Sequence, residues 1–153
     1  MLALKQADKA LPLFTDFLAG RRERLGRDDL RFAGVLASVG NDLLKHGQDA
    51  AAEKVLDECL SIRAKKQPDD WRTFNTRSML GGALLGQKKY AEAEALLLQG
   101  YEGMKKREAA IPPEVRSMRL TDALGRIVLL YEASGRKEQA QEWRQKLKAA
   151  TKE

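Results

Sequence analysis

The chain repeats a pattern of about forty residues, and this repetition limits its fold more than any other feature. The stretch LLKHGQDAAAEKVL at 43–56 returns in outline as LLGQKKYAEAEALL at 84–97, at an offset of 41 residues that also places Gly40 on Gly81. A weaker third copy, LLYEASGRKEQAQEW, spans 129–143. Such a period is typical of stacked supersecondary units that bury their apolar faces only against their neighbours. The sequence therefore predicts an open, elongated array whose surface is suited to holding another molecule.

Composition indicates that the repeating unit is helical. Of 153 residues, 43% are hydrophobic and 33% are charged, as in globular chains. Aromatic residues make up 6%, whereas Ala, Leu, Glu, Lys and Arg abound, and these unbranched side chains favour helix. No segment alternates β-branched and polar residues. We therefore expect an all-α fold and a single repeat domain over residues 1–153.

Breakers and apolar periodicity divide this domain into four parts. We expect an unpaired N-terminal helix in 1–27, then repeat 1 at 28–67, repeat 2 at 68–110, and repeat 3 with a C-terminal cap at 111–153. The first helix has apolar positions at Leu4, Ala7, Leu11, Phe14, Phe17 and Leu18. The six later helices are expected near 28–45, 51–64, 69–87, 90–107, 114–134 and 137–148. Acidic pairs begin the second and fourth helices, where a carboxylate can cap free amides.

Small residues predict how each hairpin closes. Gly40 and Gly81 occupy equivalent positions at which the two helix axes can approach closely. The third copy has Val128 at this position, and Arg144 stands where the first two copies have leucine. The six additional residues of the third offset fit the AAIPPE segment, which is expected to widen that connection.

These alternating positions, VG--LL--G----A-E--L---C and LG--LL-----Y-EAE--L---G, resemble the tetratricopeptide repeat. The long spacing is similar to the repeats of kinesin light chains, whose second helix runs into a charged IREK-like stretch, here IRAK at 62–65. The blocks PDDWRTFNTRSMLGGALLGQKKYAEAEALLLQGYEG and IPPE-R---RL--AL-R-V-LYEA-G also resemble repeat segments of bacterial, planctomycete serine/threonine kinases. The resemblance implies a right-handed α-solenoid of about seven helices, with a concave groove that binds peptides or proteins. A scaffold or sensor part of a larger signalling protein is the expected role.

Residues suited to catalysis or metal binding are scarce. His46 is the sole histidine, and Cys59, the sole cysteine, aligns with Gly100 of the next copy, as a small core residue does. The GGALLGQKK segment lacks the GK[ST] ending of a phosphate loop. Carboxylates of AEAE and PDDW are expected on a solvated face or at a helix start. We therefore expect no enzyme activity, no cofactor and no metal.

The first helix of each hairpin lines the concave side in proteins of this resemblance. The candidate peptide-binding residues there are Asn41, Lys45, Asn75, Ser78 and Arg126. An amide side chain can hydrogen-bond both the N–H and the C=O of an extended backbone. Simple hydration of a polar helix face is the alternative, which the sequence leaves open.

One known ligand of the family is disfavoured. In the tetratricopeptide repeat family, the clamp that binds the C-terminal carboxylate of chaperones consists of two lysines, two asparagines and an arginine. Asn41 and Arg126 match this set, whereas Ala37, Met79 and Asp122 do not. The resemblance therefore implies a different partner.

The net charge of +6 gives a second lead, because basic residues gather at the end of each hairpin's second helix. The clusters are Arg21, Arg22 and Arg24; Arg63, Lys65 and Lys66; and Lys105, Lys106 and Arg107. Cations at helix C-termini complement the macrodipole, and this explanation competes with an edge that attracts an acidic protein segment. Nucleic acid is disfavoured because no aromatic platform accompanies the clusters.

The remaining expectations concern location and self-association. No apolar run is long enough for a membrane span, and a single cysteine permits a reducing compartment. We expect a cytoplasmic segment without membrane contact, although MLALKQADKA starts like the middle of a helix and leaves open a longer, membrane-anchored parent. As an alternative function, the terminal helices, around Phe14, Phe17, Trp143 and Leu147, stack end to end between copies.

Overall fold

The protein is an array of helices. The computed structural model describes residues 2–152, with side chains from residue 11 onward. The expected apolar side chains at Leu4 and Ala7 lie outside the described side chains. Residues 2–152 contain seven α-helices, one short 3-10 helix and no strand, which confirms the all-α expectation. The elements are α1 (Leu2–Leu25), α2 (Leu30–Lys45), α3 (Asp49–Lys66), α4 (Trp71–Gly86), α5 (Tyr90–Lys106), η1 (Glu108–Ala110), α6 (Pro113–Ala133) and α7 (Lys137–Thr151).

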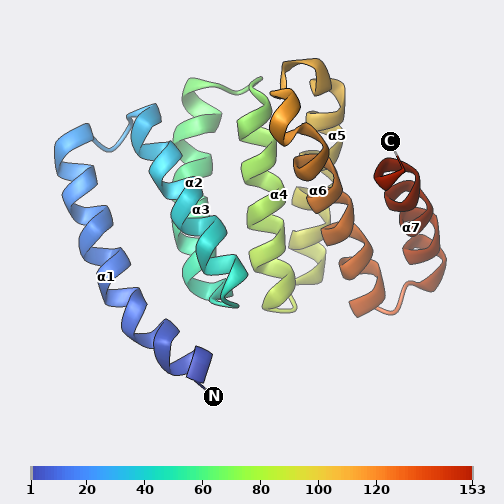
Figure 1. The fold of residues 1–153 in the computed structure, drawn as a ribbon, viewed down its shortest axis with the longest axis horizontal. Helices are drawn as coiled ribbons and strands as arrows, with labels where there is room; N and C mark the ends of the chain where they lie inside the picture. Colours follow the sequence, from blue (N-terminus) through green and yellow to red (C-terminus); the bar gives the residue numbers. More distant parts are fainter. Residues whose placement is uncertain (1, 153) are drawn as a thin grey trace.

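The helices stack in sequence order from α1 at one end to α7 at the other (Figure 1). Three hairpins, α2–α3, α4–α5 and α6–α7, follow one another, and α2 contacts α4 while α4 contacts α6. Alternate helices therefore share one layer, as in an α-solenoid. Helix α1 has no hairpin partner, and its first half projects away from the other helices (Figure 1).

Two aspartates start the first helices of the first two hairpins. The carboxylate of Asp29 accepts a hydrogen bond from the backbone N–H of Arg31 at 2.7 Å, and Asp70 accepts one from Arg72 at 2.8 Å. Both caps have extended backbone, as N-cap residues do. Helix α6 begins instead at Pro113, whose missing N–H costs nothing in the first turn.

Each hairpin turns through one residue with a left-handed backbone. The residue is Gly47 in the first hairpin (φ 69°) and Gly135 in the third (φ 74°). The second hairpin has Lys88 at the equivalent position, with φ 62°. Since a Cβ atom is disfavoured in this conformation, Lys88 is a local source of strain.

The expected close approach within the hairpins is present in the first two. A Cβ atom added to Gly40 would overlap the side chain of Leu56, and one added to Gly81 would lie 2.7 Å from Leu97 Cγ. In the third hairpin Val128 is buried in the core. Arg144, at the position of the leucine, extends outward, and its Nε donates to Glu132 at 2.8 Å.

The AAIPPE insertion is more ordered than its prolines suggest. Its first residues form η1, and Ile111 is completely buried in a cluster with Trp71, Met104 and Leu120. The guanidinium of Arg116 donates two hydrogen bonds to the carbonyl of Ile111, at 2.9 and 3.1 Å. The widened connection therefore inserts a core side chain between the second and third hairpins.

Equivalent glutamates on α3 and α5 tie each hairpin to the turn of the next. Glu53 pairs with Lys89 at 3.1 Å, and Glu94 pairs with Arg136 at 2.8 Å and accepts from the hydroxyl of Tyr131 at 3.0 Å. The hydrogen bonds from Arg136 lower the pKa of Glu94. The AEAE carboxylates lie in the first turns of α5, as expected, and the neighbouring turn partly covers Glu94, whose side chain is 29% exposed.

Replacing Lys88 by glycine is expected to stabilise the protein by about 0.5 to 1 kcal/mol, since the left-handed backbone then carries no Cβ atom. Chemical denaturation measures the free energy of unfolding. The reverse change in the first hairpin, Gly47→Lys, serves as control and is expected to destabilise by about 1 kcal/mol. A Lys88→Gly variant less stable than the wild type would contradict the proposed strain.

Gly81→Val is expected to destabilise by about 1 to 3 kcal/mol, because the added methyl groups meet Leu97. A double-mutant cycle with Leu97→Ala should show a double variant less destabilised than the sum, by about 0.5 kcal/mol or more. Gly34→Val is the matched control, because nothing lies within 4 Å of a Cβ atom at Gly34. Equal losses at both glycines would show that close approach is not the cause.

Candidate functional site

The layer formed by α2, α4 and α6 is hollowed along its surface into two adjoining cavities, which together we call the inner groove. The cationic pocket, of about 270 Å³, is lined chiefly by Asn41, Arg63, Trp71, Arg72, Asn75 and Arg119. The apolar trough, of about 640 Å³, is lined chiefly by Asn41, Leu44, Lys45, Leu85, Arg126 and Leu129. Asn41 borders both cavities, so they adjoin at this residue.

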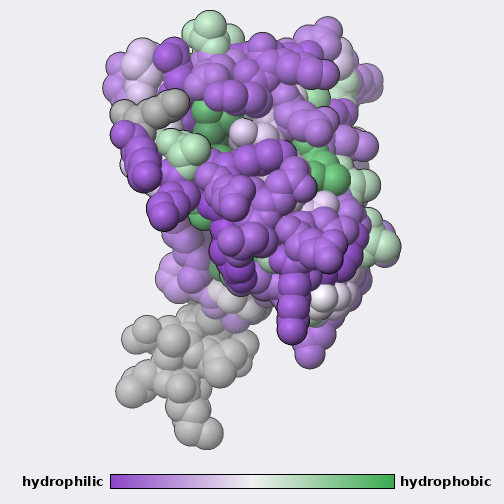
Figure 2. Space-filling view, turned by 90° about the vertical axis from the view of Figure 1, so that its right-hand side faces the viewer, coloured by the Kyte–Doolittle hydropathy of each residue, from purple (hydrophilic) through white to green (hydrophobic). Residues whose placement is uncertain are grey.

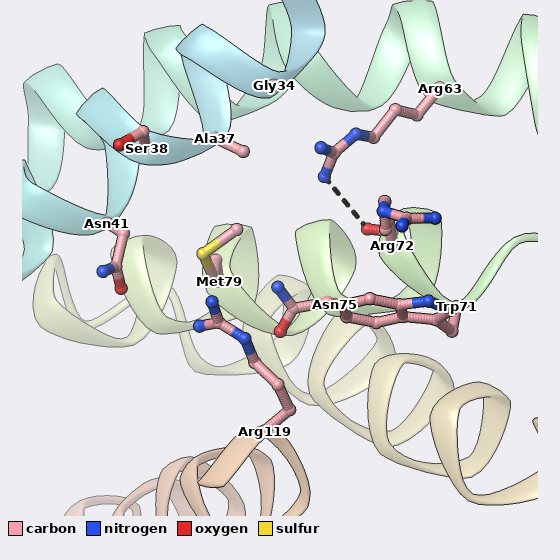
Figure 3. A pocket seen from close by; sticks show the side chains of 10 residues that line it. All are labelled: Gly34, Ala37, Ser38, Asn41, Arg63, Trp71, Arg72, Asn75, Met79 and Arg119. Carbon is pink, nitrogen blue, oxygen red and sulfur yellow. Dashed lines mark hydrogen bonds between the residues drawn. The ribbon is translucent and has the colours of Figure 1, made fainter. Parts of the chain in front are cut away.

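In the cationic pocket, Arg63 reaches from α3 across to the first turns of α4. Its Nη1 donates to Thr76 Oγ1 at 2.8 Å. The same nitrogen donates to the carbonyl of Arg72 at 3.3 Å (Figure 3). Only 7% of Arg63 is exposed, and no carboxylate lies within ion-pair distance of it in the described part of the chain. Burial lowers the pKa of Arg63. A buried cation held only by neutral acceptors leaves its charge uncompensated.

Two further polar groups in this pocket lack partners. Asn75 is 7% exposed, and within residues 11–152 its carboxamide makes no hydrogen bond. The Nε–H of Arg119 is buried and has no acceptor in the same part of the chain. Figure 3 shows both side chains directed into the same space as the guanidinium of Arg63. A buried donor without an acceptor costs about 1 to 3 kcal/mol, so the pocket has unused binding capacity.

The predicted candidate residues divide between the two cavities. Asn75 lies in the cationic pocket, Lys45 and Arg126 line the apolar trough, and Asn41 borders both. Ser78 is completely buried, and Arg126 Nη1 donates to its hydroxyl at 3.1 Å. Burial lowers the pKa of Arg126. Ser78 therefore holds Arg126 in place and has no exposed surface of its own.

The basic clusters are partly neutralised by neighbouring carboxylates. Four of their members pair with carboxylates of other segments: Arg22 with Glu58 at 2.9 Å, Lys65 with Asp28 at 3.5 Å, Lys105 with Glu108 at 2.8 Å, and Arg107 with Asp69 at 3.4 Å. A fifth, Arg63, faces the cationic pocket. Within the inner groove, arginines without a carboxylate in ion-pair distance are found in the cationic pocket, whereas the apolar trough also contains Asp49 and Asp122.

Sequence reasoning missed the pocket roles of Arg63 and Arg119. Arg119 lies seven residues, about two helical turns, before Arg126, so helix periodicity was a usable signal for it. Arg63 follows Leu56 and Cys59 on the buried face of α3, and this spacing marks it as an inward residue. Because Arg63 lies near the C-terminus of α3, the sequence favoured the interpretation that its charge interacts with the helix macrodipole instead.

The two residues whose types suggest catalysis or metal binding, His46 and Cys59, make other contacts instead. His46 is exposed, and its Nδ1 lies 2.7 Å from the carbonyl of Asp42. Cys59 is buried beside the carbonyl of Ala33, and burial raises the pKa of its thiol, which disfavours a reactive thiolate. No three potential ligands of the His, Cys, Asp and Glu types gather in the described residues. Across residues 2–152, no helix combines the length and the apolar character of a membrane span.

The two ends of the array differ in their apolar surface. Trp143 is buried, with its ring 5.6 Å from that of Tyr101 in an edge-on contact, so the expectation that it contributes to an exposed stacking face is wrong. The face over the C-terminal end is mostly hydrophilic, with small separate hydrophobic areas (Figure 2). At the other end, Leu13 is 71% exposed and Phe17 is 44% exposed.

Comparison with known proteins places the fold. Residues 73–107 match the sequence model of the tetratricopeptide repeat family. No curated protein sequence matches the chain. Its structure is similar to the crystal structure of a Podosopora anserina putative kinesin light chain with nearly identical TPR-like repeats, with a TM-score of 0.69 and 19% identity, over 96% of this chain and 68% of that one. For a crystal structure of a substituted variant of that protein the TM-score is 0.70, at 19% identity over 97% and 68% of the two chains. The described chain is therefore an α-solenoid with the fold of kinesin-light-chain-like tetratricopeptide repeats.

Proposed function

We propose that this chain is a non-catalytic protein-interaction module that holds an extended segment of a partner protein in its inner groove. Tetratricopeptide arrays commonly mediate protein–protein interactions and generally act as scaffolds rather than catalysts. The observation that carries the proposal is that the cationic pocket and the apolar trough adjoin on one layer, with Asn41 lining both. One segment can therefore present a polar or charged group to the pocket and an apolar side chain to the trough.

The apolar trough supplies the main contact area. Leu129 is 57% exposed and lies with Leu44 and Leu85 around the cavity. Burying an exposed leucine against an apolar ligand side chain is worth about 1.5 to 3 kcal/mol when it is complete. Asn41 has no side-chain hydrogen bond in the described part of the chain, so its amide is available to a peptide backbone.

The charge of the cationic pocket also indicates which kind of partner the groove suits. The uncompensated arginines favour a partner segment with negative charge. We propose that the single domain of residues 1–153 works in the cytoplasm, as the scaffold or sensor part of a larger signalling protein. Asn41, Lys45, Asn75 and Arg126 are its proposed contact residues, and Ser78 supports Arg126.

Peptides selected from a random library displayed on phage test the groove. Their dissociation constants, measured by fluorescence anisotropy, should rise about tenfold or more in Leu129→Asp, because the trough loses an apolar wall and gains a charge. Leu13→Asp introduces the same change at an exposed leucine of α1, outside the groove, and should bind like the wild type. Peptides that bind both variants equally well would show that the groove is not the binding surface.

A second candidate function is self-association through α1. Leu13 and Phe17 are exposed on this helix, and a hollow of about 500 Å³ lies between α1 and α3, lined in part by Phe14, Leu18 and Val55. An uncapped end of a solenoid tends to stack. Sedimentation equilibrium tests this candidate. It is supported if the wild type associates, Leu13→Asp abolishes the association and Leu129→Asp leaves it unchanged. A wild type that stays monomeric at high concentration excludes it.

A further inference from the structure

We propose that the cationic pocket is a binding site for the phosphate group of a phosphorylated side chain in the segment that occupies the inner groove. The inference deepens the proposed function and rests on it. It concerns Arg63, Arg119 and Asn75, which extend from α3, α6 and α4 into one cavity (Figure 3).

The first argument is charge. Arg63, Arg72 and Arg119 line the pocket, and no Asp or Glu does. Arg72 is paired with Asp70, its Nη1 lying 3.2 Å from Oδ2, whereas Arg63 and Arg119 have no carboxylate partner within residues 11–152. The pocket therefore carries about two uncompensated positive charges. A phosphate ester carries about −1.5 to −2 at pH 7, which matches this charge better than a single carboxylate does.

The second argument is the number and direction of donors. The buried Nε–H of Arg119 has no acceptor, and the carboxamide of the buried Asn75 makes no hydrogen bond in the described part of the chain. Arg63 uses only Nη1 for its bonds to Thr76 and to the carbonyl of Arg72. Donors thus converge from three helices. A phosphate ester offers three terminal oxygens to them, while a carboxylate offers two and leaves more donors unmet.

The third argument is access. The pocket volume of about 270 Å³ holds a phosphate group, and its lining includes Asn41, which also borders the apolar trough. A side chain of a segment lying in the groove can therefore reach the arginines without unfolding the array. The adjacency of the two cavities favours a phosphorylated residue of a bound peptide over a free anion.

Titration of ¹⁵N-labelled protein with N-acetyl-phosphoserine amide, in phosphate-free buffer at constant ionic strength, tests the assignment. The capped probe has the phosphate as its only charged group. We expect saturable shifts of the Arg119 Nε–H and Asn75 carboxamide signals. N-acetyl-glutamate amide should bind about tenfold more weakly, because it carries one charge.

Variants separate the pocket from general charge effects. Arg119→Gln should weaken binding of the phosphoserine probe by about tenfold or more. Without ligand the same variant should raise the melting temperature by about 2 to 4 °C, since it removes a buried unpaired donor and a repulsive charge. Arg24→Gln, at an exposed arginine of α1 outside the pocket, is the matched control and should change neither quantity.

Several outcomes would overturn the proposal: equal affinity for the glutamate probe, unchanged phosphoserine binding in Arg119→Gln, or an unchanged or lower melting temperature of that variant. Binding of inorganic phosphate without binding of the phosphoserine probe would show that the site takes a free anion, and would also overturn it. These failures leave the groove proposal intact, because the test of that proposal uses library peptides and Leu129→Asp. If Leu129→Asp does not weaken binding of the library peptides while the phosphoserine probe still binds, the peptide groove is refuted. The proposal that the phosphate belongs to a bound peptide is then refuted with it.

Discussion

The close approach of the two helices in each hairpin is the contact on which the array depends. The helix axes come together without a Cβ atom between them, because Gly40 lies under Leu56 and Gly81 lies under Leu97. Because both hairpins close in the same way, their first helices lie side by side, and the surface between those helices becomes the inner groove. The third hairpin replaces this pair by Val128 and Arg144, with the arginine turned toward Glu132. The side chain of Arg144 is 50% exposed, whereas Leu56 and Leu97 are fully buried, so the exchange suits the last hairpin of the described chain.

Much of the fold could be predicted from the sequence, because helix periodicity, acidic caps and the paired small and large residues are local signals. Asp29 and Asp70 cap the helices that their position predicts. What could not be predicted depends on contacts between hairpins. Ile111 becomes a core residue only because Trp71 and Met104 leave a space for it. Prolines around it gave a loop signal that tertiary packing overrode.

The candidate site could be predicted only in part, for the same reason. Helical spacing places Asn41, Asn75 and Arg126 on the first helices of the hairpins, and these helices form the groove layer. Arg63 lies on a second helix, whose side chains are expected to face away from that layer. It enters the pocket because Thr76 and the carbonyl of Arg72, both on the next hairpin, accept its hydrogen bonds. A sequence pattern does not contain such an acceptor pair, since it exists only after two hairpins have packed.

The pocket also has an energetic consequence for the array. Arg63 belongs to the first hairpin and Arg119 to the third, and both guanidinium groups point into one cavity (Figure 3). Without a ligand their mutual repulsion and the unmet Nε–H of Arg119 oppose the packing that brings the hairpins together. An anion bound between them reverses the sign of this contribution, and it stabilises the folded array by mass action. It also links the first and third hairpins directly, in addition to their contacts through α4. In a solenoid, where each unit relies mainly on its neighbours, such a link couples occupancy of the groove to the stiffness of the whole array.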